Sequence, residues 1–203
     1  MHVKVCGVRT PEAAAACADA GVDFVGFNFV QGRRRCVSLQ QAKSLLPLVG
    51  IAKPVGVFLN ASPQQVLEVV DALSLQWVQL HGEENVEAFR PVLRRCSVIK
   101  ALSYRTFFEK ESPWISKSQW LLVDGTEPGS GAGWSWSQLA QRSHLDIPIM
   151  LAGGLTPTNI QSAIQQARPD GVDAASGLEQ DGSLSPQRIF SFVSQAHSAL
   201  VEV

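Results

Sequence analysis

Short apolar segments alternate with helix-forming segments along the whole chain. Eight apolar segments have the length and β-branched content of buried strands, and they begin roughly 20 to 30 residues apart. They are His2–Val8, Asp23–Phe29, Lys53–Leu59, Gln76–Leu80, Ser97–Ala101, Gln119–Asp124, Ile147–Ala152 and Asp170–Ala174. This alternation is typical of parallel strands joined by crossover helices, and eight units favour a closed barrel over an open doubly wound sheet. We predict an α/β fold, a single-domain (β/α)8 TIM barrel spanning residues 1–203.

The expected helices follow the strands, and several begin at a hydroxyl residue before a proline, as at Thr10-Pro11 and Ser62-Pro63. The predicted ranges are 11–20, 38–46, 63–73, 83–94, a short helix near 136–141, one that begins at 156–157, and 185–200. Ser112-Pro113 interrupts any helix between residues 102 and 118. The fifth βα unit should therefore be irregular.

Composition narrows the class of protein. The 203 residues are 45% hydrophobic and 17% charged, which allows a sizeable core, and a net charge of −1 argues against a nucleic-acid surface. No apolar run is long enough to cross a bilayer, and the first residues lack a signal-peptide layout. The four cysteines (Cys6, Cys17, Cys36 and Cys96) have neither metal-ligand nor disulfide-framework spacing. We predict a cytoplasmic protein with no nucleic-acid or membrane partner, either a monomer or a homodimer.

The segment Ile147–Ile160 contains a candidate phosphate site. Its apolar strand stops at Gly153-Gly154, and Thr156 and Pro157 suit the cap and first residue of a helix. Backbone N–H groups and the positive end of a helix would then point at one spot, although an ordinary βα turn explains the pattern equally well. Ser176-Gly177 follows the eighth strand, and loops seven and eight are where this fold most often holds phosphate.

Active sites of such barrels lie at the carboxyl ends of the strands. Cys6 ends the first strand one residue before a glycine, which favours a working thiol over a buried apolar cysteine. Asp124 ends the apolar strand six. A carboxylate there is either held by hydrogen bonds or has a raised pKa, as a general acid would, unless it merely caps the loop.

Other polar residues at the same end permit more than one interpretation. One of Arg33-Arg34-Arg35 could bind a carboxylate bidentately, while the others form a solvated loop. The glycine-rich segment 128–133 could be a lid, an anion nest or a plain connection. His81 could contact a ligand but is poor evidence for a metal. Asp173 could orient a substrate amine or bond backbone donors.

Together these residues resemble the phosphoribosylanthranilate isomerase family, (β/α)8 enzymes of tryptophan biosynthesis. The matching motifs cover nearly the whole chain in order. They are Val3-Lys4-Val5-Cys6-Gly7, Gly26-Phe27-Asn28-Phe29, Arg35 with Val37-Ser38, Val55-Gly56-Val57-Phe58-Leu59-Asn60, Val78-Gln79-Leu80-His81-Gly82, Leu121-Leu122-Val123-Asp124, Gly129-Ser130-Gly131, Leu151-Ala152-Gly153-Gly154-Leu155 with Asn159, and Val172-Asp173 with Ser176-Gly177-Leu178-Glu179. Where the family usually has Ser-x-Arg-Tyr, this chain has Arg33-Arg34-Arg35-Cys36.

The resemblance implies specific roles. The family's thiol base falls on Cys6, its acid on Asp124 and its carboxylate-binding arginine on Arg35. Its phosphate site falls on Gly153, Gly154, Ser176 and Gly177, with Gly129, Ser130 and Gly131 nearby. The implied substrate is a phosphorylated aminosugar, N-(5'-phosphoribosyl)anthranilate, which rearranges by acid–base catalysis with no metal or redox cofactor.

Three alternatives are weighed against this function. The Amadori isomerase family of histidine biosynthesis shares the fold but has an aspartate at the position of Cys6. A pentulose-phosphate epimerase needs metal-binding histidines at several strand ends, and His81 alone does not provide them. A non-catalytic barrel that binds a sugar phosphate stays open because of the altered segment 33–36.

Overall fold

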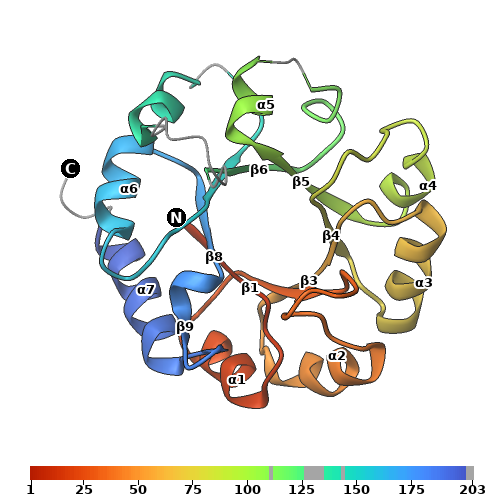
Figure 1. Cartoon of the computed structure of the whole chain (residues 1–203), viewed down its shortest axis with the longest axis horizontal. Helices are drawn as coiled ribbons and strands as arrows, with labels where there is room; N and C mark the ends of the chain where they lie inside the picture. Colours follow the sequence, from red (N-terminus) through yellow and green to blue (C-terminus); the bar gives the residue numbers. More distant parts are fainter. Residues whose placement is uncertain (110–111, 126–134, 143–144, 200–203) are drawn as a thin grey trace.

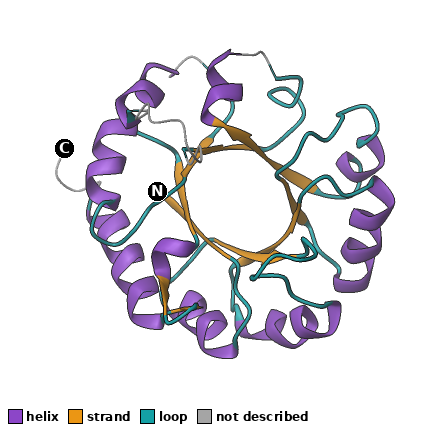
Figure 2. Ribbon diagram, in the orientation of Figure 1, coloured by secondary structure: helices purple, strands orange, loops and turns teal. Residues whose placement is uncertain are grey.

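Eight parallel strands close into a barrel with helices on the outside (Figure 1, Figure 2). The structure is a computed structural model that describes residues 1–109, 112–125, 135–142 and 145–199. The barrel strands are β1 His2–Cys6, β2 Phe24–Asn28, β3 Lys53–Phe58, β4 Trp77–Leu80, β5 Ser97–Ser103, β6 Trp120–Asp124, β7 Ile149–Ala152 and β8 Gly171–Ala174. Consecutive strands pair in order, and β8 returns to pair with β1. The predicted TIM barrel is confirmed.

The helices surround this barrel. They are α1 Pro11–Asp19, α2 Leu39–Leu45, α3 Pro63–Leu73, α4 Arg90–Leu93, α5 Tyr104–Glu109, α6 Ile160–Ala167 and α7 Pro186–Ser198, with 3-10 turns η1 Leu46–Leu48, η2 Trp136–Arg142 and η3 Ser176–Leu178. A hairpin of β9 Glu179–Gln180 and β10 Ser183–Leu184 follows β8. Within the described ranges, no helix combines the length and apolar character needed to span a membrane.

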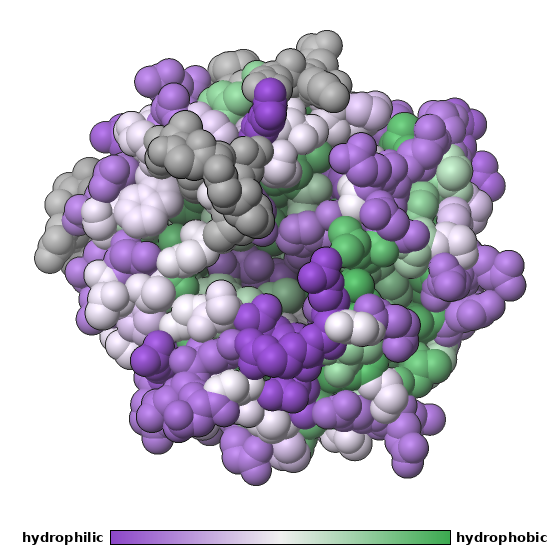
Figure 3. Space-filling view, viewed as in Figure 1, coloured by the Kyte–Doolittle hydropathy of each residue, from purple (hydrophilic) through white to green (hydrophobic). Residues whose placement is uncertain are grey.

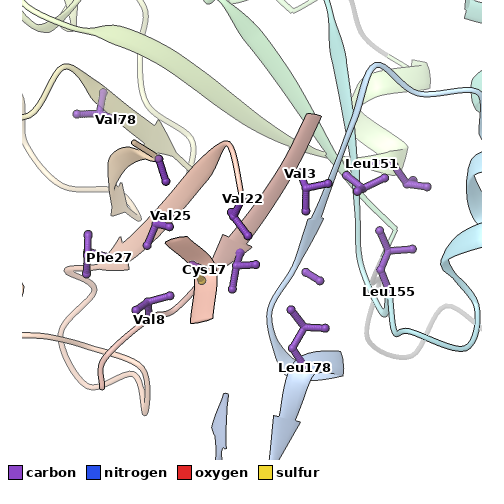
Figure 4. Close-up of a cluster of buried hydrophobic side chains, with 14 of the residues drawn as sticks. Val3, Val8, Cys17, Val22, Val25, Phe27, Val78, Leu151, Leu155 and Leu178 are labelled. Carbon is purple, nitrogen blue, oxygen red and sulfur yellow. The ribbon is translucent and has the colours of Figure 1, made fainter. Parts of the chain in front are cut away.

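Side-chain alternation along the strands creates two apolar layers. Residues such as Val3, Val25 and Leu151 point outward and pack under the helices (Figure 4). The alternate residues form a separate cluster inside the barrel, which includes Phe24 and Trp120. Because alternate residues of a strand face opposite sides, the remaining inward positions near the carboxyl ends are left for polar groups.

Most expected boundaries are within two residues of the observed ones, and the larger differences have identifiable causes. The first strand ends at Cys6 because Gly7 has φ +83° and turns the chain. The helix expected over 83–94 is reduced to α4, because the Glu84 carboxylate binds the backbone N–H of Gly82 and the Asn85 side chain caps a turn. The irregular fifth unit is confirmed, since the residues from Ser112 to Ser118 form turns and irregular structure rather than a helix.

The helix expected at Thr156-Pro157 begins later, at Ile160. The Asn159 side chain accepts from the Thr156 N–H at 2.8 Å and donates to the Gly154 carbonyl at 3.0 Å. These two bonds hold the intervening residues in a loop, so the helix starts after Asn159.

Lys100 faces the helical layer rather than the barrel interior. Its ammonium group pairs with Glu84 at 2.6 Å, and the two side chains are 3% and 1% exposed. It also donates to the Leu80 carbonyl and lies over the Trp114 ring. Burial lowers the pKa of Lys100, although Glu84 opposes this shift.

We expect Lys100→Met to lower the free energy of unfolding by about 3 kcal/mol, because it leaves the Glu84 carboxylate buried without its counter-ion. Lys100→Met combined with Glu84→Gln should recover most of this loss, since no buried charge remains. Urea titration of the three proteins measures both effects. A double variant as unstable as the single one would show that the charge is not the cause.

Candidate active site

The carboxyl ends of the strands form one polar mouth (Figure 3). Cys6 is the last residue of β1, Asp124 is the last residue of β6, and His81 directly follows β4. All three occupy inward-facing positions. A cavity of about 580 Å³ includes His81 and Asp124 in its lining, and a second of about 480 Å³ includes His81 and Arg35. The barrel therefore gathers catalytic candidates that lie far apart in the sequence.

Cys6 is partly buried against the neighbouring strand. A Cβ atom at Gly26 would lie 2.9 Å from the Cys6 sulfur, so the absence of a side chain at Gly26 makes room for the thiol. Burial raises the pKa of the Cys6 thiol, Lys4 and Arg35 oppose the rise, and Asp173 adds to it. The positive groups around Cys6 do not offset its desolvation, so the thiol form is favoured at neutral pH.

Lys4 lies two residues before Cys6 and on the same inward face of β1. Its side chain is fully buried, and its ammonium group pairs with the Asp173 carboxylate at 2.8 Å. Burial alone would lower the pKa of Lys4, but Asp173 and Cys6 outweigh it and hold the pKa above its usual value. Asp173 thus accepts a hydrogen bond from a lysine of the same chain. The sequence had suggested a substrate amine or backbone donors as its partners.

Asp124 faces His81 across the mouth. The nearest carboxylate oxygen lies 3.5 Å from His81 Nε2, and the side chains are 24% and 38% exposed, so both reach the solvent-filled mouth. On the other side of the ring, the amide nitrogen of Gln79 lies 3.1 Å from His81 Nδ1. The His81 ring therefore lies between an amide and a carboxylate, and which ring nitrogen carries the proton depends on the tautomer.

The three adjacent arginines differ in their surroundings. Arg33 is exposed, and Arg34 is held by Glu179 and by the Gly182 carbonyl. Arg35 is the partly buried one, and its Nε donates to Glu179 at 2.7 Å. No other hydrogen bond of Arg35 is made within the described residues, and Arg35 is one of the residues that line the second cavity.

Loops seven and eight lie against one another. A Cβ atom at Gly177 would lie 1.9 Å from the Leu155 carbonyl oxygen, so only glycine allows this approach. Gly153 and Gly154 have φ values of +95° and +65°, which glycine adopts readily. Among the described residues, the backbone N–H groups of Gly153, Gly154, Ser176 and Gly177 have no acceptor. Four unsatisfied donors on two touching loops suit a phosphate. Gly129, Ser130 and Gly131 lie outside the described residues.

Comparison with known proteins identifies the family. A family model described as N-(5'phosphoribosyl)anthranilate (PRA) isomerase matches residues 3–195. The chain belongs to this family. An N-(5'-phosphoribosyl)anthranilate isomerase from Rubrobacter xylanophilus is 38% identical over 97% of this chain and 98% of that protein.

Solved structures of PRA isomerases agree with this assignment. A phosphoribosyl anthranilate isomerase in complex with reduced 1-(o-carboxyphenylamino)-1-deoxyribulose 5-phosphate superposes with a TM-score of 0.84 at 31% identity, covering 98% of this chain and 99% of that one. Mutually generated monomers of the dimeric phosphoribosylanthranilate isomerase from Thermotoga maritima give a TM-score of 0.81 at 30% identity, over 97% of this chain and 98% of that one. Membership of the PRA isomerase family makes the chain an isomerase of tryptophan biosynthesis, as the sequence resemblance implied.

The sequence interpretation missed the supporting roles of Lys4, Gln79 and Glu179. Lys4 and Gln79 each stand two residues before a recognised site residue, so strand alternation places them on the same inward face. That spacing was the available signal. Glu179 belonged to a motif shared with the family, but its role was not apparent because its partners Arg34 and Arg35 are distant in sequence.

The buried environment of Cys6 predicts slow alkylation at neutral pH. Because burial raises its thiol pKa, reaction with iodoacetamide should increase as pH rises through and above the usual range near ~8.5. Lys4→Met removes a group that opposes the shift, and should move the alkylation profile to still higher pH. Mass spectrometry of the Cys6 peptide measures the extent of alkylation at several pH values. Both proteins carry Cys36→Ser, so that the other partly buried cysteine does not react. A profile for Lys4→Met shifted to lower pH would contradict the assignment.

Proposed function

We propose that Cys6 and Asp124 are the base and the acid of an Amadori rearrangement at this mouth. The substrate is N-(5'-phosphoribosyl)anthranilate and the product is 1-(2-carboxyphenylamino)-1-deoxyribulose 5-phosphate. The single observation that carries the proposal is the placement of an inward thiol and an inward carboxyl on β1 and β6, which lie across the barrel from one another (Figure 1). A pentose between them would have one group on each side.

Each group has a defined proton transfer. Asp124 donates a proton to the ring oxygen, the C1–O bond breaks, and the nitrogen lone pair forms a C1=N bond. Cys6 then removes the C2 proton, and the electrons of the C2–H bond form a C1=C2 double bond. The C1=N electrons move to the nitrogen and give a neutral enolamine. The Cys6 thiol returns a proton to C1 while the C2 hydroxyl loses its proton to the Asp124 carboxylate, so the C2=O bond of the ketone forms and both groups regain their starting forms. Positioned acid–base groups of this kind contribute about 10²- to 10⁴-fold each.

The ends of the substrate match two anion sites. The phosphate fits the free N–H groups of Gly153, Gly154, Ser176 and Gly177, with Gly129, Ser130 and Gly131 as further candidates. The anthranilate carboxylate fits the terminal amino groups of Arg35. His81 and Asp173 complete the proposed contacts, His81 at the mouth and Asp173 below Cys6. No step of this scheme uses a metal or redox cofactor.

The mechanism requires a Cys6 thiolate and an Asp124 carboxylic acid, whereas the free pKa values favour a thiol and a carboxylate. From free pKa values, a thiolate with a carboxylic acid lies ~6 kcal/mol above a thiol with a carboxylate. The raised pKa of Cys6 adds to that gap. The active form is therefore a minor one, and the pair should titrate as a coupled system.

We also propose a cytoplasmic location for the enzyme. All four cysteines are unpaired, and thiols persist in a reducing compartment.

Cys6→Ser should abolish most turnover, by about 10²-fold or more, because a serine hydroxyl is far less acidic than a thiol. Affinity for a reduced product analogue should stay within about threefold, since the thiol contributes little binding. Loss of substrate fluorescence measures turnover, and calorimetry measures binding. Asp124→Asn should behave in the same way. Equal losses of turnover and affinity in Cys6→Ser would count against the base assignment, and a wild-type chain without turnover would overturn the proposed function.

A further inference from the structure

We propose that Glu179 is a positioning residue that orients Arg35 toward a carboxylate ligand, and thereby gives the site its preference for an acidic aromatic group. The inference deepens the proposed function and rests on it. Glu179 does not itself face the reacting atoms. It acts through Arg35, at the junction between the loops after β2 and β8.

The geometry shows how one carboxylate holds two arginines. Glu179 Oε1 accepts from Arg35 Nε at 2.7 Å, and Oε2 accepts from Arg34. The Glu179 side chain is only 12% exposed, whereas Arg35 is 25% and Arg34 is 53% exposed. The contact with Arg35 is therefore the more sheltered of the two, and shelter from solvent strengthens an ion pair.

The atom that Glu179 uses determines what Arg35 can still bind. A guanidinium group has five N–H donors in a planar fork. Glu179 takes the single Nε donor, and the two terminal amino groups remain for a second anion. Arg35 lines the cavity of about 480 Å³ together with Arg33, Arg34, Asn28 and His81. Strongly hydrophilic side chains gather beside the central hollow on this face (Figure 3).

Gly7 holds the other side of Arg35. A Cβ atom at Gly7 would lie 2.4 Å from Arg35 Cδ, so the aliphatic part of the arginine rests directly on this glycine. Gly7 follows Cys6 in the chain. With one side against Gly7 and its Nε on Glu179, Arg35 is fixed relative to the thiol. A carboxylate bound by Arg35 is thereby fixed relative to Cys6.

The charge of Glu179 supports the same role. Burial alone would raise its pKa, but the hydrogen bonds and charges of Arg35 and Arg34 outweigh burial and hold the pKa below its usual value. Glu179 is therefore ionised at neutral pH, and its interaction with Arg35 is a charge-assisted hydrogen bond.

Glu179 also joins two binding functions in one short segment. It directly follows η3, which carries Ser176 and Gly177 of the proposed phosphate site. The spacing between the phosphate site and Arg35 is therefore set over a few residues. A substrate with anions at both ends would have to match this spacing.

The test uses two simple anions as probes. Calorimetry with anthranilate reports on the arginine site, and calorimetry with inorganic phosphate reports on the loops. Glu179→Ala should weaken anthranilate binding about tenfold or more, because Arg35 loses its charge-assisted anchor, and should change phosphate binding less than about twofold. Glu179→Gln keeps an acceptor for Arg35 Nε and should retain an intermediate affinity. With the full substrate, Glu179→Ala should raise KM more than it lowers kcat.

Two comparisons separate positioning from a structural role. Arg9→Gln removes bonds to the Gly182 carbonyl and to Ser183 of the same hairpin without touching Glu179, and should leave both affinities unchanged. In an Arg35→Gln background, Glu179→Ala should cause no further loss of anthranilate affinity, because residues that act through one contact are not additive.

Several outcomes would overturn the inference. One is unchanged or tighter binding of anthranilate by folded Glu179→Ala, and another is an equal loss of affinity for anthranilate and phosphate. The others are additive losses of affinity when Glu179→Ala is combined with Arg35→Gln, and a wild-type chain that does not bind anthranilate. A wild-type chain that binds both anions selectively but has no turnover would count against the catalytic proposal alone.

Discussion

The buried ion pair between Lys4 and Asp173 lies at the seam where the barrel closes. Lys4 is on the first strand and Asp173 on the last, and the two residues are paired in register. An ammonium group left alone inside the barrel would cost several kcal/mol, so Lys4 depends on the carboxylate that Asp173 of β8 supplies. This pair favours one register of closure, and it lies beneath Cys6 and before the loop that carries Ser176. Closure of the fold and assembly of the site are therefore linked.

The positive groups near Cys6 are each partly neutralised. Lys4 is paired with Asp173 and Arg35 with Glu179, so neither acts on the sulfur as an isolated charge. This arrangement explains why burial prevails and the thiol pKa is raised. The same pairs hold two long side chains in single orientations. The site therefore has well-defined geometry rather than a strong positive potential.

The strand order and the mouth residues were predictable from the sequence because buried parallel strands are apolar, evenly spaced and end at one face. The helix expected over 83–94 was not, because Glu84 and Asn85 bond to backbone groups and to Lys100, which no local pattern reveals. The start of α6 was misplaced for a similar reason, since Asn159 bonds back to Thr156. The residue types alone left all three arginines open and the family resemblance pointed to Arg35, which the structure shows to be less exposed than Arg34. Long-range polar contacts are what sequence periodicity does not encode.

The raised pKa of Cys6 has a consequence for how such a base could work. A permanent thiolate would need an unpaired cation beside it, and the two cations present are already paired. In the proposed mechanism the thiolate then forms in the substrate complex, where bound substrate excludes water and the Cys6 and Asp124 protons are redistributed together. A substrate carboxylate on Arg35 would add negative charge and make the thiolate harder to form, unless that carboxylate is held away from the sulfur. In the proposed arrangement Glu179 limits where that carboxylate can bind, because it occupies Nε and leaves the terminal amino groups of Arg35 for the ligand. Orientation of the arginine thus serves the acid–base step as well as binding.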